Sequence, residues 1–374
     1  MNIGFNKPYL TGNEADFIFQ AVLNKKLSGN GIFTKKCHSF FESTYDFKKC
    51  LLTTSGTDAL EMCAILTNVG PGDEVIVPSY TFVSTALAFA RQGATIIFAD
   101  SYPDHPNIDA DKIEKLITPR TKVIVPVHYA GVACDMDKIM EIAEKYKLYV
   151  VEDAAQAIDS YYTSKTNGKR SALGSIGHLS AFSFHETKNI MSGEGGMIVI
   201  NDERFLHRAE IIWEKGTNRA EFFRGEINKY EWIDLGSSFL PSEITAAFLW
   251  AQIEQIAAIQ QRRLDIWNWY DNHVDHLFDD FKFIKPILPS YATNNAHMYY
   301  LLLSSIDERN RYLDSMRAKG FEAVSHYLGL HQSPYYHQKH DGRELPNCDR
   351  FQDCLVRLPF FYEIEEQYIL QKLN

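Results

Sequence analysis

The chain has 374 residues, of which 45% are hydrophobic and 23% are charged, as in ordinary folded proteins. Its net charge of -10 argues against a protein that binds nucleic acid through a general basic field, although a small anionic ligand is compatible with it. A chain of this length is expected to form two domains, or at most three.

The N-terminal segment MNIGFNKPYLTGNEADF lacks the apolar stretch of a signal peptide, and no apolar run in the chain has membrane length. The six cysteines are dispersed and form no C-x-x-C pair, so they predict neither a zinc site nor a redox motif. Dispersed cysteines in a long chain are typical of reduced thiols in the cytosol. We therefore expect a cytoplasmic globular protein without a bound metal, a membrane partner or a nucleic-acid partner.

Between residues 50 and 201, short apolar runs alternate with helical stretches. This alternation predicts a doubly wound α/β domain, with a mostly parallel sheet covered by helices on both faces. Strands are predicted at 50–54, 74–78, 94–100, 122–128, 148–154, 179–185 and 195–201, and helices at 56–69, 82–93 and 136–147.

A long helical region follows at residues 241–274, and its broad apolar stripe indicates burial against a second domain or a second subunit. Beyond it, a smaller α+β unit is predicted from a strand at 296–305, a helix at 307–320 and a strand at 321–326. We place the domain boundary near residue 250, inside the long helix. The large domain would comprise residues 1–250 and the small C-terminal domain residues 251–374.

Ligands of open parallel sheets bind beyond the carboxyl ends of the strands, so polar residues at strand ends are candidate site residues. In TTSGTDAL (53–60), a strand is followed by a tight turn and the start of a helix. Gly56 would let the backbone approach an anion, which the helix amides attract. The alternative is a plain helix cap by Thr57 with no ligand, and this motif alone favours that alternative.

Two further motifs follow later strands. In VVEDAAQA (150–157), Asp153 ends a hydrophobic strand, where a carboxylate is costly unless it is paired. It would either meet a cation or cap the next helix. In FSFHETKN (182–189), Lys188 follows a strand, and a desolvated lysine has a lowered pKa and can bond to an aldehyde. The alternative is a solvated loop lysine, as most lysines are.

Together these motifs indicate a cofactor. A phosphate needs helix amides and hydroxyls, a pyridine nitrogen needs a carboxylate that keeps it protonated, and an aldehyde needs a lysine. A phosphate cradle, a strand-end aspartate and a loop lysine in this chain order are therefore the parts that hold pyridoxal 5'-phosphate.

At this point the motifs resemble a known family. TSGTDAL, GDEVIVPSYTFVSTALAF, VIVPVHYAG, VVEDAAQA, FSFHETKN and GEGGMIVIND resemble the sugar aminotransferases of the DegT/DnrJ/EryC1 family, nearly end to end. The resemblance implies the aspartate aminotransferase fold, type I, with pyridoxal phosphate as cofactor and pyridoxamine phosphate as its aminated form. It also implies a homodimer with active sites at the interface.

The resemblance further implies roles for individual residues. Lys188 would bond to the cofactor aldehyde and later move a proton, Asp153 would pair with the pyridinium nitrogen, and Gln156 would bond to the ring hydroxyl. Phe82 would stack on the ring, with core packing as its alternative. The phosphate would be bound by Gly56, Thr57 and Ser183.

One position departs from the common pattern of the family. Many members have Gly-x-Asn-x-Arg before the long helix, and the Asn reaches the cofactor phosphate of the neighbouring subunit. This chain has Ser238 and Leu240 at those positions. A serine could donate one hydrogen bond over a shorter reach, so Ser238 is retained as a candidate for that contact.

Substrate residues are expected in the matched motifs as well. His326 and Tyr327 would approach the sugar, and His185 would shape the lysine loop. Residues 213–230 are basic and rich in aromatic side chains, so Arg219 would help to grip a diphosphate. A solvated charged loop is the equal alternative for this segment.

Within the family, residues 210–232 and 234–252 resemble the branch that transfers the amino group of L-glutamate to C4 of a dTDP-linked keto sugar, dTDP-4-keto-6-deoxy-D-glucose. An aminotransferase acting on another nucleotide-linked sugar, such as a 3-keto sugar, is the alternative. The dehydratase branch has histidine in place of the lysine, so Lys188 argues against it. A non-catalytic protein of this fold would be expected to lack Lys188, Asp153 or the phosphate residues.

Overall fold

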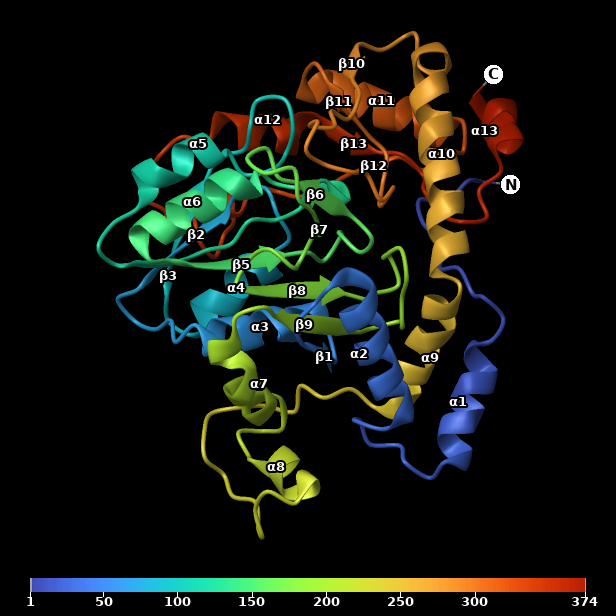
Figure 1. Ribbon diagram of the computed structural model, residues 1–374. Helices are drawn as coiled ribbons and strands as arrows, with labels where there is room; N and C mark the ends of the chain where they lie inside the picture. The colour runs from blue at the N-terminus through green and yellow to red at the C-terminus, as the bar shows by residue number, and fades with distance from the viewer. Residues whose placement is uncertain (1, 374) are drawn as a thin grey trace.

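The computed structural model describes residues 2–373, and its largest element is a seven-stranded sheet in the order β1-β9-β8-β5-β4-β2-β3 (Figure 1). The strands are β1 (Cys50–Thr53), β2 (Glu74–Pro78), β3 (Thr95–Ala99), β4 (Thr121–Ile124), β5 (Tyr149–Asp153), β8 (Leu179–Ser183) and β9 (Gly196–Ile200). Strand β9 runs antiparallel to both of its neighbours, β1 and β8, whereas the other neighbouring strands are parallel. The predicted α/β class with a mostly parallel sheet is therefore confirmed.

Helices cover both faces of this sheet because its strands are apolar on both sides. In β2, Val75 and Val77 point into one core while Ile76 points into the other, as the two-residue period of a strand requires. The first core also contains side chains of α3 (Gly56–Leu66), α4 (Ser84–Arg91) and α7 (Leu206–Trp213). The second contains side chains of α2 (Ile32–Tyr45), α5 (Ala110–Ile113), α6 (Met136–Tyr146) and α9 (Glu243–Glu254).

The C-terminal part of the chain forms a smaller antiparallel sheet in the order β10-β11-β13-β12. Its strands are β10 (Phe283–Ile284), β11 (Tyr300–Leu303), β12 (Val324–Ser325) and β13 (Leu355–Arg357), and its helices are α10 (Ile256–Leu277), α11 (Ile306–Ala318), α12 (Pro346–Cys354) and α13 (Glu366–Leu373). A third apolar core joins them, and Ile3 packs into it through a parallel bridge to Phe321. The N-terminal segment thus reaches the smaller sheet.

Several elements are not among those predicted. They include α1 (Glu14–Leu23), α8 (Arg219–Arg224), the hairpin of β6 (Tyr161–Thr163) and β7 (Arg170–Ala172), and also α2, α5, α7, α12, α13, β10 and β13. The helical region predicted at 241–274 is two helices, α9 and α10, which meet at Gln255 (φ -109°, ψ 10°). Strand β11 starts later than predicted, because Ala296 has a left-handed backbone (φ 51°) and Asn295 donates to the carbonyls of Gln156 and Ile158 (2.8 Å each).

The six cysteines are all free thiols and buried. Within residues 2–373, the structure contains no helix with the length and apolar character needed to cross a membrane.

A buried carboxylate from helix α9 binds the N-terminus of helix α2. Glu243, which is 2% exposed, accepts hydrogen bonds from the backbone amides of Gly31 (2.9 Å), Phe33 (2.8 Å) and Thr34 (3.1 Å), and from the Thr34 hydroxyl. A negative charge at a helix N-terminus is favourable, because the free amides there carry partial positive charge. Glu243 therefore ties the start of α2 to the first turn of α9.

We expect Glu243→Gln to lower the free energy of unfolding by about 2–3 kcal/mol, because hydrogen bonds to a charged acceptor are lost and the new amide NH₂ faces donors. Urea unfolding followed by circular dichroism measures the change. Glu254→Gln on the exposed end of α9 is the control, and it should change stability by less than about 0.5 kcal/mol. Equal effects of the two substitutions would contradict this account of α2.

Candidate active site

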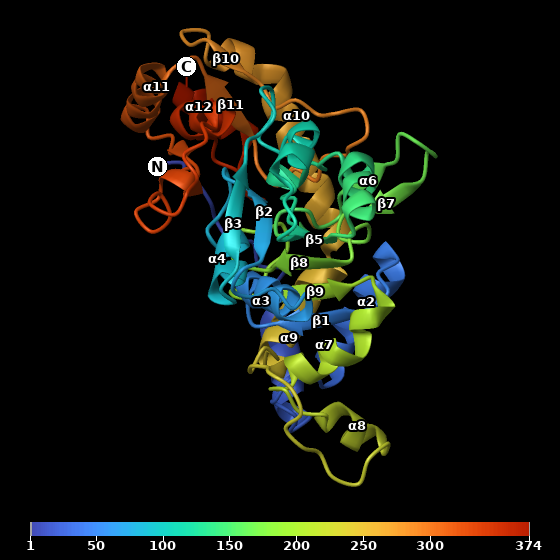
Figure 2. The same cartoon turned by 90° about the vertical axis from the view of Figure 1, so that its left-hand side faces the viewer.

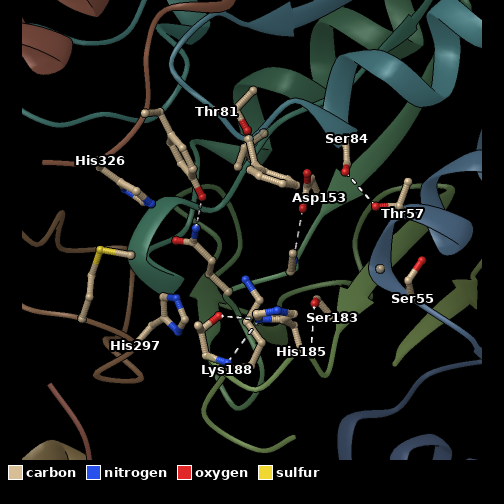
Figure 3. Close-up of a pocket in the computed structure, with 18 of the residues that line it drawn as sticks. Ser55, Thr57, Thr81, Ser84, Asp153, Ser183, His185, Lys188, His297 and His326 are labelled. Carbon is tan, nitrogen blue, oxygen red and sulfur yellow. Dashed lines mark hydrogen bonds between the residues drawn. The ribbon is translucent and has the colours of Figure 1, made fainter. Parts of the chain in front are cut away.

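A cavity of about 720 Å³ lies at the carboxyl ends of the parallel strands, where the large sheet meets segments of the C-terminal part (Figure 3). The position agrees with the rule for open parallel sheets. The cavity brings together seven predicted cofactor residues and three predicted substrate residues: Gly56, Thr57, Phe82, Asp153, Gln156, Ser183, Lys188, His185, His326 and Tyr327.

One end of the cavity is the N-terminus of α3. Ser55 caps this helix, since its side chain accepts from the amide of Asp58 (3.0 Å), so the alternative of Thr57 as the cap is wrong. The Thr57 hydroxyl instead lies 2.7 Å from the Ser84 hydroxyl (Figure 3). A Cβ atom on Gly56 would lie 2.8 Å from the Cβ of Ser183, so the helix start can approach β8 only with glycine here.

This donor set fits a phosphate. Helix amides carry partial positive charge, and the hydroxyl groups of Thr57, Ser84 and Ser183 line the same end of the cavity. Ser84 was not predicted, because a serine inside an apolar helical pattern gives no signal of its own.

Among residues 2–373, no group of three or more His, Cys, Asp or Glu side chains could hold a metal ion.

Asp153 lies at the end of β5 and is 5% exposed. It accepts hydrogen bonds from the Thr85 hydroxyl (2.7 Å) and the Ala155 amide (3.2 Å). Burial raises the pKa of Asp153, while these two hydrogen bonds and the charge of Lys188 act in the opposite direction. Residues 154–160 form turns, so Asp153 does not cap a helix, and the carboxylate is available to a cationic group in the cavity.

Lys188 follows β8 and points into the cavity (Figure 3). Burial lowers the pKa of Lys188 to about 8, the charge of Asp153 opposes the shift, and the charge of Arg357 adds to it. The next residue is held firmly, because Asn189 donates to Gln260 (2.9 Å) and to the backbone carbonyl of residue 295 (2.8 Å). The loop that contains Lys188 is therefore held in place, and its amine is partly unprotonated near neutral pH. The alternative of a solvated loop lysine is wrong.

Gln156 and Phe82 also line the cavity. Gln156 donates to the Tyr327 hydroxyl (2.9 Å) and accepts from the Ala130 amide (2.6 Å), so its amide is held in one orientation. Phe82 is 57% exposed, and its ring lies 6.3 Å from that of Tyr327, centroid to centroid. Core packing, the alternative for Phe82, is therefore wrong.

The opposite end of the cavity is formed by the C-terminal part of the chain. The rings of His326 and Tyr327 are stacked with centroids 3.5 Å apart, and His326 Nδ1 lies 2.6 Å from the Tyr129 hydroxyl. Burial holds the pKa of His326 well below its ordinary value, so its ring is neutral. His185 lies at the rim, where its Nδ1 is 3.0 Å from the Thr187 hydroxyl and its Nε2 is 3.7 Å from Glu194.

Two predicted residues do not line the cavity of their own chain. Arg219 belongs to α8, which projects away from the large sheet in both views (Figure 1 and Figure 2), and its guanidinium lies 3.7 Å from Glu214 and 5.0 Å from the Phe223 ring. Ser238 is exposed where this projection rejoins the sheet domain, next to Glu214. Contacts of either residue with a ligand would require a second subunit, so both roles stay predictions.

Sequence reasoning also missed His297 and Arg357, which line the cavity, and Thr85, which lies behind it as the hydrogen-bond partner of Asp153. His297 donates through Nδ1 to the Asn189 side chain (2.9 Å), because the Asn189 nitrogen already donates to a backbone carbonyl. His297 and Arg357 come from apolar strand-like stretches far along the chain. No local pattern marks them, and only the fold brings them to the cavity.

A hydrogen-bonded link of Ser79, His331 and Asp349 joins two walls of the cavity. The Ser79 hydroxyl lies 2.7 Å from His331 Nδ1 and accepts from the His331 amide (3.1 Å). His331 Nε2 lies 3.3 Å from Asp349. The link fixes the segment that contains Tyr327 to the segment that contains Phe82.

The chain as a whole is similar to known aminotransferases. The model of the DegT/DnrJ/EryC1/StrS aminotransferase family matches residues 11–372. GDP-perosamine synthase of Caulobacter vibrioides is 32% identical over 335 residues, which cover 88% of this chain and 85% of that protein.

Solved structures with a similar fold cover the whole chain. The protein Spr1654 of Streptococcus pneumoniae, solved in PLP and PMP forms, has a TM-score of 0.88 at 25% identity, and the PLP form covers 100% of this chain and 97% of its own. PseC of Helicobacter pylori, an aminotransferase involved in the biosynthesis of pseudoaminic acid, has a TM-score of 0.87 at 25% identity, covering 100% of this chain and 97% of its own.

Proposed function

Since the chain belongs to the DegT/DnrJ/EryC1/StrS aminotransferase family, we propose that it transfers the amino group of L-glutamate to C4 of dTDP-4-keto-6-deoxy-D-glucose. The products would be dTDP-4-amino-4,6-dideoxy-D-galactose and 2-oxoglutarate. Without regard to the particular sugar, the chain is a pyridoxal-phosphate-dependent aminotransferase of nucleotide-linked keto sugars. The choice of sugar rests on the resemblance of residues 210–232 and 234–252 to dTDP-4-amino-4,6-dideoxygalactose transaminases, which serve enterobacterial common antigen and related surface polysaccharides.

The observation that carries the proposal is Lys188, a lysine whose pKa is lowered by burial to about 8 and which lines the cavity together with Asp153. The helix start at Gly56, with the hydroxyls of Thr57, Ser84 and Ser183, would hold the phosphate. Asp153 would accept a hydrogen bond from the protonated ring nitrogen. Gln156 would bond to the ring hydroxyl, and Phe82 would cover one face of the ring.

When bound, pyridoxal phosphate supplies an aldehyde that bonds to amines and a protonated ring that withdraws electrons from the neighbouring carbon. The chain supplies the proton transfers. Lys188 Nζ, once free, takes the proton from the α-carbon of the amino donor and, in the second half of the reaction, gives a proton to C4 of the sugar. An amine with a pKa of about 8 can do both near neutral pH.

The lowered pKa of Lys188 predicts how the cofactor-free protein captures pyridoxal phosphate. Only the unprotonated amine reacts, so the capture rate should rise about tenfold per pH unit below pH 8 and level off above it. Stopped-flow absorbance between pH 7 and 10 measures this profile. A rate that still rises at pH 10 would show an ordinary lysine and would contradict the electrostatics described for the cavity.

Product analysis tests which keto sugar the protein aminates. The protein loaded with pyridoxal phosphate is incubated with L-glutamate and, in separate reactions, with dTDP-4-keto-6-deoxy-D-glucose, its 3-keto isomer and a GDP-linked 4-keto sugar. NMR of each product identifies the aminated carbon and its configuration. The GDP-linked sugar is the second candidate, which the identity to GDP-perosamine synthase favours. The proposal fails if the dTDP-linked 4-keto sugar is not the best substrate.

We also propose a homodimer with active sites at the interface. Arg219 and Ser238 lie outside the cavity of their own chain, and the projection that includes α8 exposes apolar side chains of Phe223, Trp232 and Leu235. Exposed apolar groups of this size are typical of surfaces that contact a protein. Sedimentation of the purified protein tests this assembly.

A further inference from the structure

His297 is a cavity residue that none of the proposed cofactor contacts uses. It precedes β11, is 8% exposed and lies on the C-terminal side of the cavity with His326 (Figure 3). Its backbone is held on both sides, because its amide donates to the Asn295 side chain (3.1 Å) and its carbonyl accepts from Arg263 (2.7 Å). The imidazole ring of His297 therefore has a defined position.

The chain decides which ring nitrogen of His297 carries the hydrogen. The Asn189 side-chain nitrogen donates to the backbone carbonyl of Asn295 (2.8 Å), a group that can only accept. The other end of the Asn189 amide is therefore its oxygen, and it lies 2.9 Å from His297 Nδ1. Burial holds the pKa of His297 well below its ordinary value, and the charge of Lys188 adds to this shift. The ring is thus neutral, with its hydrogen on Nδ1 and a lone pair on Nε2.

The chain provides no partner for this lone pair. Across residues 2–373, no hydrogen bond reaches His297 Nε2, and the atom is open to the cavity rather than enclosed by side chains. A polar atom of a largely buried side chain is costly when it stays unpaired. The cavity therefore contains a hydrogen-bond acceptor that a ligand can satisfy.

Two other histidines show how His297 differs. His128 is fully buried, and the chain uses both of its ring nitrogens: Nδ1 accepts from a backbone amide (3.2 Å) and Nε2 lies 2.9 Å from Glu152. His326 faces the Tyr129 hydroxyl, which can donate or accept, so its neighbours do not fix its hydrogen. In His297, by contrast, the chain fixes the hydrogen on one nitrogen and leaves the other nitrogen unpaired.

An acceptor at this position distinguishes between the ligands of an aminotransferase. Carboxylate and phosphate groups offer acceptors at neutral pH, so they do not pair with Nε2. The amino group of L-glutamate is the group that reacts. A keto sugar, however, has hydroxyl groups that donate. The charge of Lys188 acts on His297, so the ring lies near the reacting amine and near the carbon that receives the amino group.

We propose that His297 Nε2 accepts a hydrogen bond from a sugar hydroxyl on a carbon next to the keto carbon, an inference that rests on the proposed function. In dTDP-4-keto-6-deoxy-D-glucose this group is the 3-hydroxyl, because C5, the other neighbour of C4, has no hydroxyl group. A sugar without the 3-hydroxyl would leave Nε2 unpaired inside the closed complex, which is unfavourable. His297 would therefore contribute to the choice of sugar.

The test compares two sugars on two proteins. Protein loaded with pyridoxamine phosphate is mixed with dTDP-4-keto-6-deoxy-D-glucose or with its 3-deoxy analogue, and the change in cofactor absorbance gives the rate constant at low sugar concentration. The wild type should favour the 3-hydroxyl sugar by about 5- to 50-fold. His297→Phe should lower the rate with this sugar by a similar factor and discriminate less than about threefold, as in a double-mutant cycle.

Three further measurements make the result specific. His297→Gln, which has an amide oxygen in reach of the Nε2 position, should keep part of the preference. Calorimetric binding of the two sugars to the cofactor-free wild type should show the same preference without turnover. In the reaction of the pyridoxal phosphate form with L-glutamate, His297→Phe should change the rate by less than about threefold.

His105→Phe is the matched control, because His105 is also a buried histidine with an unpaired ring nitrogen but lies outside the lining of the cavity. It should keep the wild-type preference between the two sugars. The comparison of the two sugars on the wild type requires no variant, so it decides the question even if His297→Phe folds poorly.

The outcomes separate the roles of His297. Equal losses of His297→Phe with sugar and with glutamate would show that the ring acts on Lys188, and a wild type that treats the two sugars alike would show that no hydroxyl is bound. Either result overturns the inference and leaves the proposed function intact. A wild type that binds the 3-hydroxyl sugar more tightly through His297 but aminates neither sugar would overturn the proposed function and support the inference.

Discussion

Replacing Lys188 by alanine is expected to lower turnover by at least about 10⁴-fold, because the variant loses the group that transfers the proton between carbon atoms. The lysine-bound form of the cofactor, with its yellow colour, should also be lost. Borohydride should therefore fail to attach the cofactor to the variant, as mass spectrometry would show. Pyridoxal phosphate should still bind without a covalent bond, because the helix start at Gly56 and the side chain of Asp153 remain.

Lys7→Ala is the matched control for this experiment. Lys7 is an exposed lysine that pairs with Glu363 and lies outside the lining of the cavity, so its loss should leave turnover and colour unchanged. Added methylamine should restore part of the activity of Lys188→Ala, because it returns an amine to the emptied space. Substantial turnover of Lys188→Ala without any added amine would overturn the assignment of Lys188.

Asp153→Asn is the second substitution with a large expected effect. Asparagine keeps the size of the side chain and can still accept from Thr85, but it cannot hold a proton on the ring nitrogen. Losing one preorganised electrostatic contact of this kind should lower turnover by about 10²–10³-fold. Steady-state kinetics at saturating substrate would measure the loss, and the absorbance of the lysine-bound cofactor should remain.

A cofactor analogue makes the Asp153 experiment decisive. Pyridoxal phosphate methylated at the ring nitrogen carries a permanent positive charge, so it should restore much of the activity of Asp153→Asn while helping the wild type little. Thr85→Val is the companion variant, because it removes the hydrogen bond to Asp153 without removing the charge, and its loss should be below that of Asp153→Asn. If the analogue restores nothing, Asp153 does not act on the ring nitrogen.

The seven-stranded sheet was predictable because its signals are local. Apolar strand-like runs such as EVIVP (74–78) end in turns and alternate with helices, and each run is apolar on both faces. Polar residues such as Asp153 and Lys188 follow those runs directly. Since the carboxyl ends of parallel strands meet at one edge of a sheet, their order along the chain was enough to place them in one cavity.

The rest of the cavity depends on contacts that are distant in sequence. Thr85 reaches Asp153 across 68 residues, and Tyr129 reaches His326 across 197. No spacing rule relates such pairs, because the packing of two sheets decides them. Arg357 is the clearest case: it lies within the apolar stretch LVRLPF, which has no polar pattern that marks a site, and the fold places it in the lining of the cavity.

The link of Ser79, His331 and Asp349 has the residue types and hydrogen-bonding distances of a hydrolase triad. Hydrolysis would need a serine oxygen that a carbonyl carbon can approach, but Ser79 is fully buried and its oxygen already accepts from the His331 amide. The imidazole is also reversed, with Nδ1 toward serine and Nε2 toward aspartate. A search for esterases or peptidases by three-residue geometry alone would thus select this transferase, and solvent access to the serine oxygen is the criterion that rejects it.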